Sequence, residues 1–288
     1  MSTDSQIPVF FINMDDAADR RDWFEAQASR LGLEVTRVAA VAGRDLPGET
    51  LARLKASIQS GTPLGPSEIG CFLSHRRVWE QVLASGAEWA FVAEDDLHLA
   101  DSAAAYFRST GWIPGDAELI KAETTFRRCH MARQGALAPD GRHLRQLLSL
   151  HGGAGGYFIS RKAAQDALDL TRDICEPADH VLFNPDFGFF NTHKTYQIDP
   201  AIAVQDLLRR ENKAGFLQSG LAIERKSQNS VPAITLIQRE LIRPFRQFVQ
   251  WLKDRWRVVR DQTSFEAVEY RLSESGVVQN NRVKRKRS

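Results

Sequence analysis

The chain has 288 residues, of which 43% are hydrophobic and 26% charged, a composition typical of a soluble globular protein with a large core. No stretch approaches the roughly 18 uninterrupted apolar residues that a spanning helix needs, and the start, Met-Ser-Thr-Asp, predicts no signal peptide. The three widely spaced cysteines, Cys71, Cys129 and Cys175, predict neither a disulfide framework nor a zinc knuckle, and they fit a reducing cytoplasm.

The net charge of +2 is unevenly distributed along the chain. Residues 1–232 carry 25 Lys and Arg against 30 Asp and Glu, a net of −5, whereas residues 233–288 carry 13 against 6, a net of +7. The acidic body and the basic C-terminal segment therefore predict different partners. The length fits one α/β domain with an appendage, or two small domains.

The N-terminal elements predict a β-α-β unit. Residues 8–13 form an apolar run typical of a buried strand. Residues 14–33 place Phe24, Ala28 and Leu31 at helical spacing, and residues 34–43 return as a second strand. Such a unit usually begins a parallel sheet with helices on its faces.

The middle of the chain continues the alternation. Residues 46–68 predict a helix followed by a Gly/Pro-rich loop, and residues 69–85 predict an amphipathic helix that ends at Gly86. Residues 89–96 then form an apolar strand that ends in acids, and residues 117–123 predict a short strand.

The following third of the chain is less regular. Residues 124–150 are polar and Arg-rich and predict an excursion between elements. Residues 152–160 enter a strand, and Ser160 is a candidate N-cap for the helix that follows. Residues 171–200 show little periodicity and predict loops with one short helix.

Three adjacent acids, Glu94, Asp95 and Asp96, lie where the strand at residues 89–96 ends. Ligands gather at the carboxyl ends of strands in parallel sheets, and hard oxygen ligands suit Mg²⁺ or Mn²⁺ together with phosphate oxygens. The triplet therefore predicts a divalent cation that carries a diphosphate. A solvated turn or a helix N-terminus would account for the same residues.

Six blocks of sequence, in order, resemble glycosyltransferase family 25, the bacterial lipopolysaccharide glycosyltransferases that are similar to collagen galactosyltransferases. The most specific is EIGCFLSH, which begins at Glu68. The blocks lie within about residues 7–206 and read FFINMDDAADRR, LGPSEIGCFLSHRRVW, AEDDLHL, LIKAE, GGAGGYFISRKAA and EPADHVL.

The resemblance implies a GT-A-like, Rossmann-type α/β domain over residues 1–232, with a nucleotide-binding half and an acceptor half. It also implies an inverting transfer of a sugar, often galactose, from a UDP-sugar donor. By the family's acidic motif, Asp96 is the direct metal ligand, Glu94 is its companion, and Asp95 contacts the donor.

The reaction also needs a carboxylate base within reach of the acceptor hydroxyl. Asp179, in the EPADHVL block, is the first candidate, and an N-cap of a short helix beginning at His180 is its structural alternative. Glu123 is the second candidate, and a pair with Lys121 or with an arginine of residues 127–133 is its alternative.

Four further residues are candidates for donor binding. Asn13 and Arg20 could contact the nucleotide from the first strand-to-helix turn, with the arginine on phosphate. A solvated helix position is the commoner fate of such an arginine. Ser74 and His75 enter only through the family motif, because a histidine in an amphipathic helix is more often a hydrogen-bonded structural residue.

Other functions compete with this prediction. A metal-dependent phosphoryl or nucleotidyl transferase could use the same acids, and a catalytically inactive nucleotide-sugar-binding protein is a third possibility. Nucleic-acid binding is disfavoured, because the body is acidic and the basic tail lacks interleaved aromatic residues.

The C-terminal segment, residues 233–288, predicts a basic amphipathic helical extension and a disordered tail. Residues 233–260 place apolar side chains at steps of three and four, with arginines on the other face and Pro244 as a kink. Such a helix could pack on the domain or lie in an anionic membrane interface. The second alternative predicts a cytoplasmic enzyme attached peripherally to the inner face of the membrane, where it would meet a glycan or glycolipid acceptor.

Overall fold

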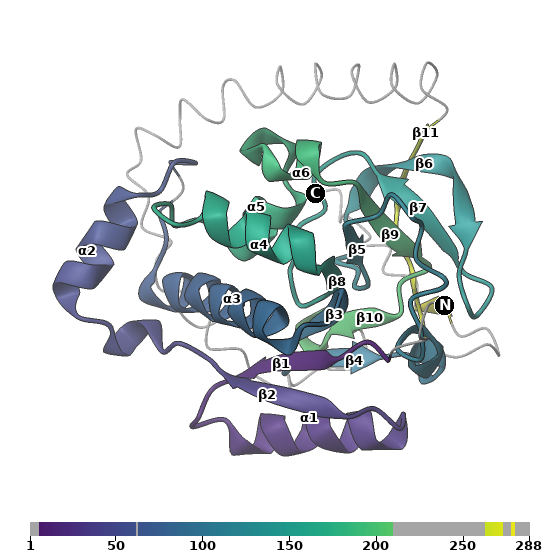
Figure 1. Cartoon of the computed structure of the whole chain (residues 1–288), viewed down its shortest axis with the longest axis horizontal. Helices are drawn as coiled ribbons and strands as arrows, with labels where there is room; N and C mark the ends of the chain where they lie inside the picture. Colours follow the sequence, from purple (N-terminus) through teal and green to yellow (C-terminus); the bar gives the residue numbers. More distant parts are fainter. Residues whose placement is uncertain (1–5, 62, 210–262, 273–277, 280–288) are drawn as a thin grey trace, which may run out of the picture.

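A computed structural model describes residues 6–61, 63–209, 263–272 and 278–279. Its centre is a nine-stranded mixed sheet in the order β11-β6-β7-β9-β5-β8-β3-β1-β2 (Figure 1). The strands of this sheet, in chain order, are β1 (Val9–Asn13), β2 (Val35–Ala39), β3 (Trp89–Glu94), β5 (Leu119–Lys121), β6 (Arg128–Leu137), β7 (His143–Leu147), β8 (Gly156–Ser160), β9 (Thr195–Asp199) and β11 (Thr263–Ala267).

Two small antiparallel pairs complete the strands that the structure describes. They are β4 (Leu97–Leu99) with β10 (Ala203–Gln205), and β12 (Tyr270–Arg271) with β13 (Val278–Gln279). The β4–β10 pair matters for the site, because it brings residues just after position 200 alongside the end of β3.

The directions of the central strands bring several strand ends together at one edge of the sheet. β1 pairs in parallel with both β2 and β3, and β8 lies antiparallel between β3 and β5. The carboxyl ends of β1, β3 and β5 and the amino end of β8 therefore meet at the same edge. Open α/β sheets bind their ligands at such an edge.

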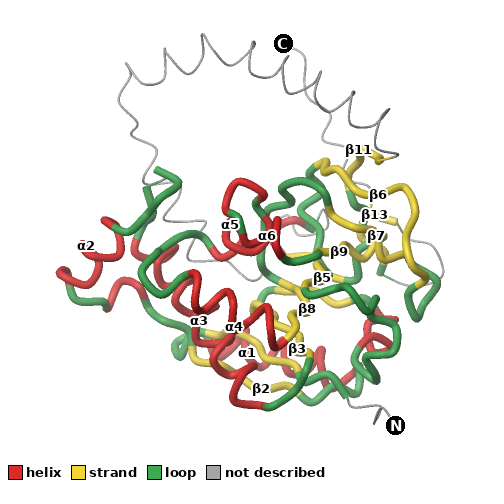
Figure 2. The backbone as a smooth tube through the Cα atoms, turned by 45° about the horizontal axis from the view of Figure 1, so that its top comes forward, coloured by secondary structure: helices red, strands yellow, loops and turns green. Residues whose placement is uncertain are grey.

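Helices cover both faces of this sheet, as Figures 1 and 2 show. Helix α1 (Ala18–Arg30) packs on one face together with the 3₁₀ segment η2 (Asp101–Tyr106), and α3, α4 and α5 pack on the other. The helices other than α1 are α2 (Gly48–Ala56), α3 (Pro66–Ser85), α4 (Arg161–Leu170), α5 (Ala178–Phe183) and α6 (Phe189–Thr192).

The alternation of side chains along the central strands creates two hydrophobic cores. In β1, Phe11 packs with Phe24 of α1, with ring centroids 4.8 Å apart. Its neighbours Phe10 and Ile12 point to the opposite core, which also contains Trp79 of α3. Both faces are thus buried, which explains the continuous apolar runs in β1 and β3.

The expected α/β class is confirmed, and most of the predicted N-terminal elements occur where expected. Gly86 ends α3 in the left-handed conformation, with φ of 75°. The Ser160 side chain caps α4 by accepting a hydrogen bond from the Ala163 N–H at 3.0 Å.

Two regions differ from the sequence-based expectation. Residues 124–150 contain the hairpin of β6 and β7, and residues 171–200 contain β9 as well as short helices. These strands join the sheet beside one another through antiparallel β6–β7 and β7–β9 pairs. The sheet is consequently mixed, not simply parallel.

The predicted C-terminal extension is only partly covered by the described residues. The amphipathic stretch 233–260 and the basic tail 282–288 lie outside them, so the division at residue 232 stays a prediction. Residues 263–267, however, form the edge strand β11 against β6, and Tyr270 is fully buried. Part of the extension therefore belongs to the main sheet.

Candidate active site

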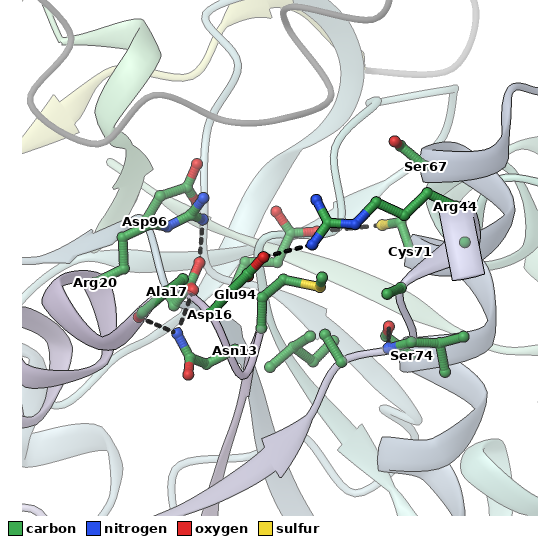
Figure 3. Close-up of a pocket in the computed structure, with 17 residues that line it drawn as sticks. Asn13, Asp16, Ala17, Arg20, Arg44, Ser67, Cys71, Ser74, Glu94 and Asp96 are labelled. Atoms are coloured by element: carbon green, nitrogen blue, oxygen red, sulfur yellow. Dashed lines mark hydrogen bonds and ion pairs between the residues drawn. The ribbon is translucent and has the colours of Figure 1, made fainter. Parts of the chain in front are cut away.

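A cavity of about 320 Å³ lies at the carboxyl ends of β1 and β3 (Figure 3). Its walls come from the start of α1, the loop after β2, the start of α3 and the turn after β3. Six predicted site residues line it, namely Asn13, Arg20, Ser74, Glu94, Asp95 and Asp96. The other three, His75, Glu123 and Asp179, are not part of this lining.

The three adjacent acids have three different environments. Asp95 is held by the first strand-to-helix turn, because Asn13 Nδ2 donates to Asp95 Oδ2 at 2.7 Å and Arg20 forms an ion pair with the other oxygen. Burial raises the pKa of Asp95, and the charge of Arg20 and the Asn13 hydrogen bond only partly offset it. The Arg20 side chain therefore points into the cavity and is not a solvated helix residue.

Asn13 is an organising residue of this turn. Its side-chain nitrogen also donates to the Ala17 carbonyl at 3.0 Å, and its side-chain oxygen accepts from Arg37 Nε at 2.8 Å. Because every side-chain contact of Asn13 is internal, its role in the structure is to position Asp95 and the start of α1.

Glu94 faces the opposite wall of the cavity. Its Oε1 lies 3.4 Å from His75 Nε2 and 3.8 Å from Cys71 Sγ, and its Oε2 accepts from Gln205 Nε2 at 2.8 Å. Burial opposes ionisation, but the His75 contact, the charge of Arg20 and the Gln205 hydrogen bond together lower the pKa of Glu94. Glu94 is therefore held as a carboxylate.

Asp96 has the environment of a cation ligand. The residue is 5% exposed, and Oδ1 is a buried oxygen without a hydrogen-bond partner in the described part of the chain. Burial, followed by the negative charge of Glu94, raises the pKa of Asp96 well above its ordinary value. A positive ion at this oxygen would relieve both effects, so the residues present fit a divalent cation.

Ser74 and His75 have mainly structural contacts. Ser74 Oγ donates to the Gly70 carbonyl at 2.7 Å and accepts from the Val41 N–H at 2.8 Å, which ties α3 to the loop after β2. His75 is completely buried, and its Nδ1 lies 3.0 Å from the Tyr157 hydroxyl. Of the predicted donor-binding pair, only Ser74 reaches the cavity.

The two candidate bases meet at the glycine-rich turn before β8. Asp179 Oδ2 accepts from the Gly153 N–H at 2.8 Å, and Glu123 Oε1 accepts from the Gly155 N–H at 2.7 Å. Glycine is required at residue 153, because its φ is 90° and a Cβ there would lie 2.8 Å from Glu123 Oε1. The turn thus brings together two carboxylates that are far apart in sequence.

The two carboxylates differ in accessibility. Glu123 is fully buried, lies 3.1 Å from Lys121 Nζ, and has a pKa raised mainly by burial. This pair with Lys121 is the structural alternative that the sequence allowed. Asp179 is half-buried and lies in the first turn of α5, where Pro177 is the N-cap, so its side chain is not the N-cap of that helix.

Three residues of the site were not assigned to it by sequence reasoning. Cys71 is half-buried and lines the cavity. Gln205 reaches Glu94 from β10, and Tyr157 reaches His75 from β8. The Cys71–His75 spacing of four on one helix face was a usable signal, whereas Gln205 and Tyr157 depend on strand pairing.

Comparison with known proteins gives a consistent result. The family model described as glycosyltransferase family 25 (LPS biosynthesis protein) matches residues 6–182. The lacto-N-neotetraose biosynthesis glycosyltransferase LgtB of Neisseria gonorrhoeae is 31% identical over 210 residues, which cover 68% of this chain and 73% of that protein. The lipooligosaccharide biosynthesis protein lex-1 of Haemophilus influenzae is 26% identical over 198 residues, 65% of each chain.

Among solved structures, a glycosyltransferase involved in glycosylation of the major capsid of PBCV-1 aligns with a TM-score of 0.40 and 9% identity. The alignment covers 70% of this chain and 92% of that chain. This likeness is too weak to support a functional comparison.

Proposed function

Because the chain belongs to glycosyltransferase family 25, we propose that it transfers galactose from UDP-galactose, with inversion, to a glycan or glycolipid acceptor of lipopolysaccharide. The family membership confirms the resemblance carried by the sequence motifs. The observation that supports the proposal most directly is the cavity at the carboxyl ends of β1 and β3, where Arg20 meets the acidic triplet Glu94, Asp95 and Asp96.

The donor half of the reaction is assigned to this cavity. Asp96 and Glu94 would hold Mn²⁺ or Mg²⁺, while Asp95, positioned by Asn13 and Arg20, would contact the nucleotide sugar. The partnerless Oδ1 of Asp96 and the ionised state of Glu94 support this division of roles. A bound divalent ion would stabilise the negative charge that develops on the diphosphate leaving group.

The acceptor half is assigned to the turn at residues 153–155. The acceptor oxygen would attack the anomeric carbon as the bond from that carbon to the diphosphate breaks, and UDP would leave with the electron pair. The proton of the attacking hydroxyl would pass to a carboxylate base. Asp179 is the proposed base, because it is partly exposed while Glu123 is fully buried beside Lys121.

A panel of nucleotide sugars tests the proposal. The full chain is incubated with UDP-galactose, UDP-glucose and other donors, with Mn²⁺, with Mg²⁺ and with chelator. Metal-dependent release of UDP, and protection against thermal unfolding by one donor, are the expected results. Cleavage that leaves the sugar attached to phosphate would favour a phosphoryl or nucleotidyl transferase, and donor binding without any turnover would favour a binding protein.

The proposed place of action is the inner face of the cytoplasmic membrane. Within the described residues, none of the helices has the length and apolar character of a transmembrane span. Attachment would instead depend on residues 233–260, whose sequence combines an apolar stripe with an arginine-rich face. This region lies outside the described residues.

Vesicle binding tests this attachment. Because β11 follows that region and pairs with β6, deletion of the whole C-terminal segment would disturb the sheet. Replacement of Arg255, Arg257 and Arg260 by glutamate in the full chain is the better variant. Weaker sedimentation with anionic vesicles at low salt is expected, and unchanged sedimentation would contradict the prediction.

A further inference from the structure

Beside the cavity, Glu94 of the acidic turn meets two side chains of α3 that form with it a second set of possible metal ligands, different in chemistry from the three acids. Cys71 and His75 lie one turn apart on α3, and Glu94 lies at the end of β3 opposite them. One ligand atom from each of these residues lies within 4.8 Å of the others, and no other group of this kind occurs among the residues that the structure describes.

The spacing of these atoms approaches that of a tetrahedral ion. Nitrogen and oxygen ligands at about 2.0–2.1 Å from Zn²⁺ are separated by about 3.3 Å, and a thiolate at about 2.3 Å is separated from an oxygen by about 3.6 Å. The observed distances are 3.4 Å from His75 Nε2 to Glu94 Oε1 and 3.8 Å from Cys71 Sγ to the same oxygen. For these two pairs, shifts of a few tenths of an ångström would complete the geometry.

Hydrogen bonds around the three ligands already support this arrangement. The Tyr157 hydroxyl accepts from Trp79 Nε1 at 2.8 Å and lies 3.0 Å from His75 Nδ1. With its proton on Nδ1, His75 would donate to that oxygen and turn the lone pair of Nε2 toward Glu94. Metal-ligating histidines characteristically donate their second ring nitrogen in this way. Gln205 holds the other oxygen of Glu94.

The ligand set selects the ion. A thiolate and an imidazole favour Zn²⁺ over Mg²⁺ or Mn²⁺, which prefer oxygen ligands. Cys71 and Glu94 both line the cavity, so a fourth coordination position would open toward the space assigned to the donor. Binding would release the proton of the Cys71 thiol to solvent and leave the thiolate on the metal.

We propose that Cys71, His75 and Glu94 form a zinc-binding site that inhibits the transferase by removing Glu94 from the Mn²⁺ or Mg²⁺ site. Zinc binding by the three residues does not depend on the proposed function, whereas the inhibition rests on it. Zn²⁺ would thus compete with Mn²⁺ or Mg²⁺ for one shared carboxylate.

Cobalt titration of the full chain, without donor or acceptor, tests the site itself. Co²⁺ is a spectroscopic substitute for Zn²⁺, and a cysteine ligand gives a thiolate-to-cobalt charge-transfer band in the near ultraviolet. We expect one equivalent of Co²⁺ to give this band and Zn²⁺ to abolish it. The band should be lost in Cys71→Ser and retained in Cys175→Ala, which changes a buried cysteine outside the cluster. Tyr157→Phe should weaken binding about 10- to 100-fold.

Absence of a thiolate band in the wild-type chain would overturn the proposal, as would a band that Cys71→Ser leaves unchanged. Glu94→Gln provides a second variant if Cys71→Ser does not fold, and undiminished Co²⁺ affinity in Glu94→Gln would also overturn it.

Inhibition is measured separately, as the ratio of sugar transfer with and without Zn²⁺ at constant Mn²⁺. A lower ratio for the wild-type chain than for Cys71→Ser is expected, and equal ratios would refute the inhibitory role. If no donor is turned over at all, the proposed function fails while the cobalt result still decides the site.

Discussion

Replacement of Asp96 by asparagine should make the metal-free protein more stable. In the wild-type chain, a buried carboxylate oxygen has no hydrogen-bond partner in the described structure, and Glu94, Asp95 and Glu123 contribute further negative charge. Asp96→Asn nearly keeps the shape and leaves a polar amide at the site, so its gain comes from removal of the buried charge and not from a satisfied hydrogen bond. We expect the free energy of unfolding at pH 7 in chelator to rise by about 1.4 kcal/mol for each pH unit by which the raised pKa of Asp96 exceeds 3.8, up to pH 7.

The stability that Asp96→Asn gains over the wild type should increase as the pH rises. Because burial and neighbouring charge raise the pKa of Asp96, the folded protein holds this proton to higher pH than the unfolded chain does. The metal-free wild type should therefore lose stability as the pH rises from 3.8, the ordinary pKa, toward the raised pKa. The difference between wild type and Asp96→Asn should shrink as the pH falls to 3.8.

Divalent metal should make the wild type more stable than Asp96→Asn. At a Mn²⁺ concentration 100 times its dissociation constant, binding to the folded state stabilises the wild type by about 2.7 kcal/mol, and Asp96→Asn should gain far less. Urea unfolding followed by tryptophan fluorescence, with and without Mn²⁺, measures both effects.

Asp173→Asn, at an exposed position, is the control and should change stability by less than about 0.5 kcal/mol. If Asp96→Asn is less stable than wild type in chelator, or if Mn²⁺ stabilises both proteins equally, the assignment of Asp96 as a metal ligand is refuted.

Three further predictions concern the proposed base, the hydroxyl beside His75 and the glycine-rich turn before β8. Asp179→Asn should keep donor binding and lose about 10²–10⁴-fold in turnover, the usual contribution of a general base. If Asp179→Asn keeps wild-type turnover and Glu123→Gln loses it, Glu123 is the base instead of Asp179. Tyr157→Phe should lower the free energy of unfolding by about 1–3 kcal/mol, because it leaves two buried ring nitrogens without their hydroxyl partner; unchanged urea unfolding would contradict this. Gly153→Ala should destabilise the protein more than Gly32→Ala. Both glycines have positive φ, so each change carries a backbone cost of about 1–2 kcal/mol, but only at residue 153 would the added Cβ lie 2.8 Å from Glu123. Equal losses in thermal unfolding would show that this close approach is unimportant.

Local pattern was sufficient for the N-terminal half of the described chain. The strand at β1, the helix α1 and the strand at β3 follow from apolar runs, helical spacing and stop signals within 5–20 residues. The same holds for the N-cap at Ser160. The acidic turn was recognisable because three carboxylates follow a strand that is buried on both faces.

Local pattern failed where strands depend on distant partners. β6, β7 and β9 are polar, short or irregular in sequence, and each is stabilised by pairing with another strand of this set. The edge strand β11 lies more than 120 residues after its partner β6 in the chain. The stability of a strand comes mainly from its neighbours in the sheet, which composition within a short window does not specify.

The different environments of the three acids were decided by the tertiary structure alone. Sequence placed Glu94, Asp95 and Asp96 together and predicted a cation there, because three adjacent carboxylates need positive charge. Successive residues in and after a strand point in different directions, so each acid meets a different part of the fold. Asp95 meets Arg20 of α1, Glu94 meets His75 of α3 and Gln205 of β10, and Asp96 keeps a buried oxygen without a hydrogen-bond partner among the described residues. These partners lie 19 to 111 positions away from Glu94 or Asp95 in the chain, and only the folding of α1, α3 and β10 around the sheet edge brings them within reach.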